Sequence, residues 1–224
     1  MGFKRQIKPA SFNRDSLTGA MVGIGMQFAA SPTHMPNIED TLLAASVEGV
    51  DRSDIRVLSV MTTWLDVHSP RVNVDRLVRA LSSEASRRVR LYWAAVAKWK
   101  RSDARWARIA QLYSGPREDI VPEGSDFSIG RHGEDPRFVD GPLRTSKGML
   151  RDRPADVLSP ERLAQQHRGY YWRVVIGPTY RADMWAQLEA DPTLPAAELA
   201  RRSYGSFATA WQVRRDWGLA NPGT

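Results

Sequence analysis

The stretch Leu194-Pro-Ala-Ala-Glu-Leu-Ala-Arg-Arg-Ser-Tyr-Gly-Ser-Phe-Ala-Thr-Ala-Trp-Gln-Val-Arg-Arg-Asp-Trp217 determines how the C-terminal part of the chain folds. It divides into two short helical patterns separated by Tyr204-Gly205. Pro195 suits the first position of a helix, and Leu199 and Ala200 fall on its inner face. The stretch therefore predicts two helices joined by a tight turn.

The second of these helices has one apolar stripe and one polar face. Ser206 is a good N-cap, and Ala210, Val213 and Trp217 recur at steps of three and four residues, which predicts that all three are buried. The residues left outside are Phe207, Ala208, Thr209, Gln212, Arg214 and Arg215. Short polar and basic side chains at the start of a second helix are what the major groove of DNA accepts.

Residues 178–217 resemble the helix-turn-helix of bacterial transcription regulators, including winged-helix antitoxin-type repressors. The run 176–191 is similar to the helix that precedes the motif in such regulators, which usually have glycine or another small residue where Tyr204 stands. The resemblance implies DNA binding through the second helix. The alternative is a small three-helix bundle that makes protein contacts.

The resemblance implies roles for several side chains. Phe207 would meet a thymine methyl group and Gln212 would form a paired hydrogen bond to adenine, with Thr209 and Arg215 reaching a base edge or a phosphate nearby. The full set of candidate residues in this region is Arg201, Arg202, Ser206, Phe207, Thr209, Gln212, Arg214 and Arg215.

The composition narrows the class of protein. The 224 residues include 42% hydrophobic residues and eight tryptophans, enough for a substantial core. A net charge of +7 favours a polyanionic partner, with nucleic acid first and an anionic membrane surface second. The absence of cysteine excludes disulfides, thiolate zinc sites and a cysteine nucleophile.

Residues 86–113 carry an excess of positive charge equal to that of the whole chain, with eight basic residues against the single acid Asp103. Their apolar residues fall at helical spacing, which predicts two amphipathic helices meeting near Ser102 with a basic outer face. Phosphate contacts are one interpretation, and a solvated face over a core containing Trp93, Trp99 and Trp106 is the other. The candidate residues are Arg87, Arg88, Arg90, Lys98, Lys100, Arg101, Arg105 and Arg108.

The remaining sequence predicts a mainly α protein. Asn37, Ser53 or Asp54, and Asn73 each precede a helical pattern, so residues 1–113 are expected to form an all-helical N-terminal domain. Residues 114–158 have no periodicity and are rich in glycine and proline, which predicts an irregular linker. Residues 159–224 then form a C-terminal helix-turn-helix domain. The linker is expected to pack through Phe127, Ile129, Phe138, Val139 and Leu143.

The N-terminus has the charge order of a secretory signal, because Lys4, Arg5, Lys8 and Arg14 precede an apolar run. Glycines interrupt that run and no stretch is long enough to span a membrane, so we expect a cytoplasmic protein. The four histidines lie at least 34 residues apart, and no dinucleotide loop, phosphate loop or nucleophile elbow occurs. We therefore expect no enzymatic activity, no metal and no cofactor.

Two functions follow from these patterns. The first is a DNA-binding transcription regulator or antitoxin-type autorepressor that binds double-stranded DNA, with RNA as the other candidate nucleic acid. The second is a non-enzymatic adaptor of a multiprotein assembly, for example in phage defence, that binds RNA or an acidic protein. A homodimer or a protein partner encoded in the same operon is compatible with both.

Overall fold

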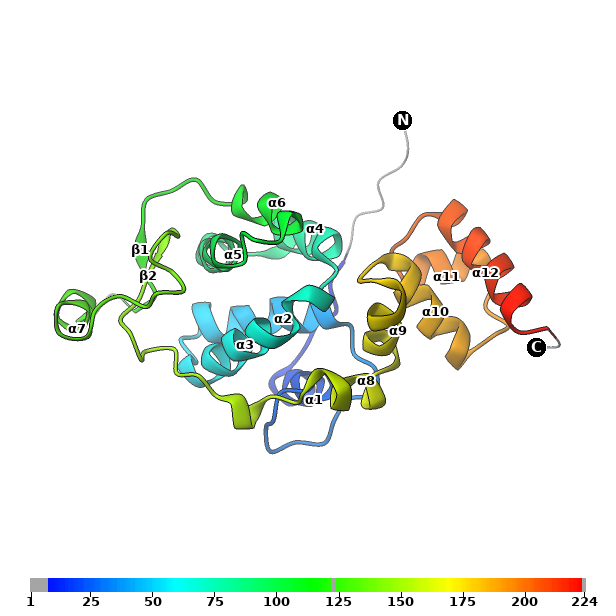
Figure 1. The fold of residues 1–224 in the computed structure, drawn as a ribbon, viewed down its shortest axis with the longest axis horizontal. Coiled ribbons are helices and arrows are strands. Elements are labelled where there is room, and N and C mark those ends of the chain that lie inside the picture. The colour runs from blue at the N-terminus through cyan, green and yellow to red at the C-terminus, as the bar shows by residue number, and fades with distance from the viewer. Residues whose placement is uncertain (1–7, 122–123, 223–224) are drawn as a thin grey trace.

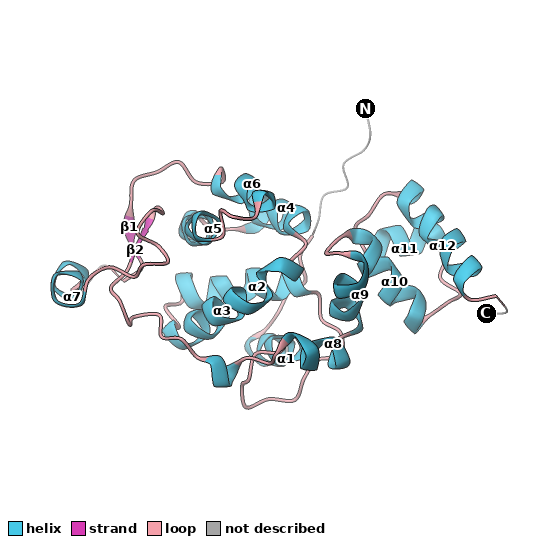
Figure 2. Cartoon of the chain, viewed as in Figure 1, coloured by secondary structure: helices cyan, strands magenta, loops and turns pink. Residues whose placement is uncertain are grey.

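The protein is mainly α-helical, as a computed structural model that describes residues 8–121 and 124–222 shows (Figures 1 and 2). The α-helices are α1 (Arg14–Gly23), α2 (Ile38–Ser46), α3 (Ile55–His68), α4 (Val74–Glu84), α5 (Arg87–Trp99), α6 (Ala107–Ala110), α7 (Ser125–His132), α8 (Pro160–Gln166), α9 (Arg168–Ile176), α10 (Tyr180–Ala190), α11 (Ala196–Arg202) and α12 (Phe207–Ala220). Short irregular helical turns cover Val47–Asp51, Ser69–Arg71, Ala104–Trp106 and Pro154–Asp156. Two parallel strands, β1 (Glu118–Asp119) and β2 (Leu143–Arg144), complete the described elements.

The helix starts follow the predicted caps. The side chains of Asn37, Asp54 and Asn73 accept hydrogen bonds from backbone N–H groups in the first turns of α2, α3 and α4. These bonds satisfy donors that a helix start leaves free. After Ser46 the chain continues from α2 as a π-helical turn to Asp51.

A single large hydrophobic core extends from Leu17 in α1 to Tyr170 in α9. Trp93 and Trp106 are fully buried in it with ring centres 6.4 Å apart, and Trp99 is partly buried. The prediction that these tryptophans belong to the core is confirmed.

The segment predicted to be a linker contributes to this core. Phe138 and Leu143 are buried, and β2 pairs with β1 in parallel. Leu158 and Leu163 belong to the same core, so it continues past residue 113 into α8. Phe127 and Val139 are exposed, which corrects the expectation that they pack: Phe127 lies on α7, which projects from one end of the molecule in Figure 1.

The extended backbone of His167 separates α8 from α9. The expected helix over 176–191 begins later, because Gly177 adopts a φ of 86° and α10 starts at Tyr180. Lys4 and Arg5 lie outside the described residues. Among the described residues, no helix is both long and apolar enough to cross a membrane.

Candidate nucleic-acid interface

Helices α10, α11 and α12 lie together at the end of the molecule opposite α7 (Figure 1). They enclose a small second core made of Met184, Leu188, Leu194, Leu199, Ala200, Ala210 and Val213. The burial of Ala210 and Val213 confirms the predicted phase of α12. Trp217 is only partly buried, so the expectation of full burial is wrong: it packs at the edge of this core with its ring 5.2 Å from that of Trp185.

Helix α12 begins at the predicted N-cap. The Ser206 hydroxyl accepts a hydrogen bond from the Thr209 backbone N–H at 3.0 Å and lies 2.8 Å from the Thr209 hydroxyl. Both side chains are therefore engaged in capping the helix.

The turn between α11 and α12 is tight because of two adjacent residues. Tyr204 adopts the left-handed conformation with a φ of 53°. A Cβ atom on Gly205 would lie 2.3 Å from the Met184 methyl carbon, so any larger residue here would force the end of the Met184 side chain to move. Glycine thus serves close packing here, and tyrosine takes the left-handed position.

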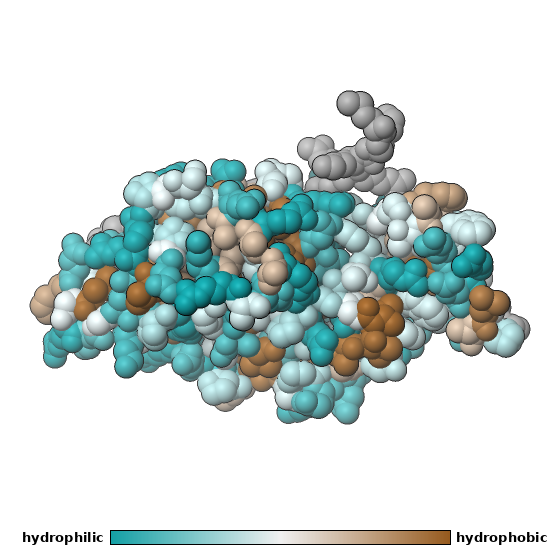
Figure 3. All heavy atoms as spheres, turned by 45° about the horizontal axis from the view of Figure 1, so that its top comes forward, coloured by the Kyte–Doolittle hydropathy of each residue, from teal (hydrophilic) through white to brown (hydrophobic). Residues whose placement is uncertain are grey.

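The outer face of α12 carries both aromatic and polar side chains. Phe207 and Trp211 are 59% and 53% exposed, and Gln212 and Arg215 are also exposed. The Arg215 guanidinium carbon lies 5.6 Å from the centre of the Trp211 ring. Because Phe207 faces outward, it does not pack beneath the motif. On the face drawn in Figure 3, hydrophobic residues form several separate areas, one of them larger than the rest.

The other predicted arginines of this region have partners within the protein. Arg201 and Arg202 both bind Glu198, with the closest contacts at 2.6 and 2.7 Å, and their hydrogen bonds lower the pKa of that partly buried carboxyl to about 2. Arg214 donates to the main-chain oxygen of Leu194. Arg215 has the longest ion pair of the set: its guanidinium nitrogen lies 3.7 Å from a carboxylate oxygen of Asp216, the next residue along α12.

The Arg-rich segment 86–113 does not present the expected excess of unpaired charge. Acidic side chains bind Arg87, Lys100, Arg101, Arg105 and Arg108, and Arg88 donates to the Ile120 carbonyl. Four of these acids, Glu118, Asp66, Asp140 and Asp75, come from other parts of the chain. Within the described residues, Arg88, Arg90 and Lys98 are the members of this set without an ion pair, and Arg88 is engaged by its bond to the carbonyl. The net charge of a segment therefore says little about its free charge once the chain has folded.

Buried ion pairs join the three-helix unit to the large core. Arg173 of α9 is 1% exposed and lies 2.6 Å from Glu39 of α2 and 2.9 Å from Asp183 of α10. Arg76 of α4 lies 3.0 Å from Asp40. Burial raises the pKa of the Asp183 carboxyl. Burial also opposes ionisation of Glu39, but Arg173, Arg76 and the Asn73 backbone N–H together outweigh it and hold the pKa of that carboxyl below its usual range.

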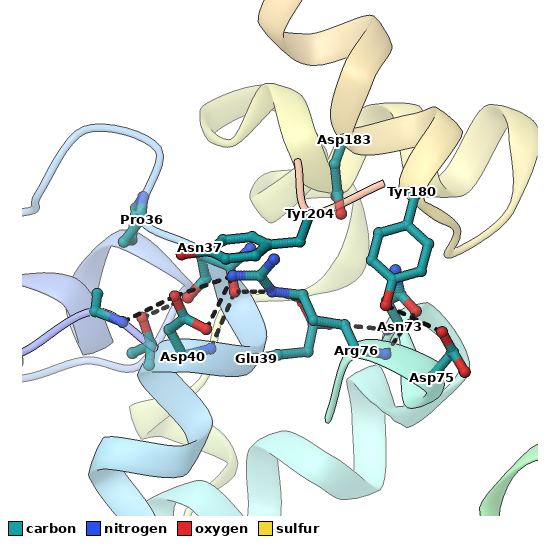
Figure 4. Close-up of polar contacts among 12 residues, drawn as sticks. Pro36, Asn37, Glu39, Asp40, Asn73, Asp75, Arg76, Tyr180, Asp183 and Tyr204 are labelled. Carbon is teal, nitrogen blue, oxygen red and sulfur yellow. Dashed lines mark hydrogen bonds and ion pairs between the residues drawn. The ribbon is translucent and has the colours of Figure 1, made fainter. Parts of the chain in front are cut away.

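Tyr204 and Tyr180 extend this junction (Figure 4). The Arg76 guanidinium carbon lies 4.4 Å from the centre of the Tyr204 ring, and the Tyr180 hydroxyl donates to Asp75 at 3.0 Å. The turn of the motif is therefore fixed against α4. Helical spacing in the sequence could not predict either contact, because Arg76 and Tyr204, like Asp75 and Tyr180, lie more than 100 residues apart.

Comparison with known protein families finds none that matches the chain, and comparisons with curated proteins and with solved structures find no match either. Among the described residues there is also no group of three or more histidine, aspartate and glutamate side chains arranged to hold a metal ion.

Proposed function

We propose that the protein binds double-stranded DNA and reads base sequence with α12. The observation that carries the proposal is the arrangement of α11, the tight turn and α12 around a shared core, with Gln212 and Arg215 exposed on the outer face. In helix-turn-helix proteins the second helix enters the major groove and its N-terminal part contacts base edges.

The free side chains on this face suit base contacts. Gln212 has no hydrogen-bond partner among the described residues, so its amide is available to pair with adenine, and Phe207 presents an apolar ring to a thymine methyl group. Ser206 and Thr209 are engaged in the cap, so their part in binding is to hold the helix start in place.

The test is a salt titration of binding to two duplexes, one taken from the region upstream of the protein's own gene and one of random sequence. A preference for the first that persists as salt rises supports a transcription regulator. Equal and wholly salt-sensitive binding to both, or no binding to either, contradicts base reading.

Protein binding by the same helix is the second candidate function. It is favoured by Phe207, Trp211 and Leu219, which follow at four- and eight-residue steps and are more than half exposed. Exposed aromatic side chains along one helix are typical of contact surfaces between proteins. A Trp211→Ala variant that loses a protein partner but keeps DNA affinity would support this adaptor role.

A further inference from the structure

The three-helix unit has little free positive charge for binding phosphates. Residues 178–217 contain five arginines and five acids, so the net charge is zero. Arg181 binds Asp216, Arg201 and Arg202 bind Glu198, and Arg214 donates to a carbonyl. Binding to duplex DNA nonetheless depends on cations that contact phosphates. The cations must therefore come from another part of the chain.

The N-terminal segment lies against the turn of the motif. The Tyr204 hydroxyl donates to the main-chain oxygen of Lys8 at 2.7 Å, although the two residues are 196 positions apart. Two residues further along, the backbone N–H of Ala10 donates to Asp40 at 3.1 Å. Asp40 in turn binds Arg76, over which Tyr204 packs. Hydrogen bonds at Lys8 and at Ala10 thus fix the backbone of residues 8–10 in place.

Lys8 is an unpaired cation at this position. Its side chain is exposed, and within the described part of the chain no acidic group pairs with it. Tyr204 is two residues before Ser206, the N-cap of α12, so the segment is attached next to the start of the proposed recognition helix. In the sequence, Lys4 and Arg5 precede Lys8 and the first acid is Asp15.

We infer that Lys8 is a phosphate-binding residue, held beside α12 by Tyr204, and that it supplies sequence-independent affinity for duplex DNA. This inference rests on the proposed function. It assigns the electrostatic part of binding to the N-terminal segment and the base reading to α12, a division seen where a basic arm follows the DNA beside a recognition helix.

The test measures binding of the full chain to a preferred and to a random duplex across a range of salt concentrations. Lys8→Gln should weaken binding to both duplexes about three- to tenfold near physiological salt and reduce the salt slope by about one. Lys147→Gln is the matched control, since Lys147 is also exposed and has no ion pair among the described residues, and it should bind as the wild type does.

Tyr204→Phe tests the positioning. It removes the hydroxyl that holds Lys8 and keeps the ring over Arg76, so binding to both duplexes should fall by less than in Lys8→Gln, with unchanged thermal stability. Wild-type affinity in Tyr204→Phe overturns the positioning role.

The outcomes separate the two proposals. If the wild type binds DNA and Lys8→Gln binds equally well, the inference fails and the proposed function stands. If Lys8→Gln weakens only the preferred duplex, Lys8 contacts bases and the phosphate assignment is wrong. If the wild type binds no duplex, the proposed function fails and the inference fails with it.

Discussion

At the scale of single residues, the junction depends on buried arginines whose partners are remote in the sequence. Arg173 and Glu39 are 134 residues apart, and both are almost completely buried. A carboxylate in such surroundings is tolerated only while a cation and hydrogen bonds compensate for its lost hydration. Helical spacing predicts which residues face inward, but it does not predict which charges meet there, so these residues were missing from the predicted site.

Replacing Arg173 with methionine should be strongly destabilising. The variant leaves Glu39 and Asp183 buried without their shared cation, which costs about 3–5 kcal/mol. Urea unfolding measures the change. Arg162→Met on the exposed surface of α8 is the control and should remain within about 0.5 kcal/mol of the wild type. A similarly small effect of Arg173→Met would show that the junction contributes little to stability.

Trp217→Ala should have a moderate effect. A fully buried tryptophan costs about 3–5 kcal/mol when truncated, and because Trp217 is partly exposed we expect about 1–3 kcal/mol. The same substitution at Trp211, on the outer face of the same helix, should cost less than 1 kcal/mol, on the order of an ordinary surface change. Equal losses of unfolding free energy in the two variants would contradict the observed phase of α12.

At the scale of elements, prediction succeeded where the cause is local. The caps at Asn37, Asn73 and Ser206 act within one turn, so each helix start could be located from the sequence. The outer face of α5 could not be predicted, because the groups that bind Arg87 and Arg88 belong to residues 118–120. The parallel pairing of β1 and β2 likewise has no signal in strands of two residues.

Because Arg87 and Arg88 are bound by groups of the protein itself, the Arg-rich segment 86–113 should contribute less to DNA binding than its sequence predicts. If Arg87, Arg88 and Arg90 all met phosphates, changing them to glutamine would lower the salt slope by up to about three. Because the first two are engaged within the protein, we expect a decrease of at most about one in the triple variant, together with lower stability. A decrease near three in the salt titration would show that these arginines leave their partners to bind DNA.

At the scale of the whole molecule, two buried histidines make stability depend on pH. His68 and His167 each have Nε2 beside a backbone carbonyl, so Nε2 carries the proton, and each Nδ1 accepts a hydrogen bond from Tyr170. Burial lowers the pKa of both, that of His68 from 6.5 to about 4. Protonation would create a charge in a buried site, and at each histidine the new Nδ1–H would face the Tyr170 group that donates to that atom.

Stability should therefore fall as the pH drops from 6.5 to 4. In this window the unfolded chain binds protons that the folded chain does not, and the His68 shift corresponds to a loss of about 3 kcal/mol by pH 4. Urea unfolding at several pH values measures it. His68→Gln should flatten the dependence, whereas His132→Gln, at an exposed position, should leave it unchanged. Identical pH profiles for His68→Gln and the wild type would refute this explanation.

Base reading by α12 predicts a specific effect of Gln212→Ala on sequence preference. A preferred duplex is first selected with the wild type from a randomised pool, and binding to it and to an unrelated duplex is then measured. The variant should lose about 1–3 kcal/mol on the preferred duplex and little on the other. Gln165→Ala, at a position on α8 that is also exposed, should alter neither. An equal loss on both duplexes, or no loss on either, would contradict base reading by α12.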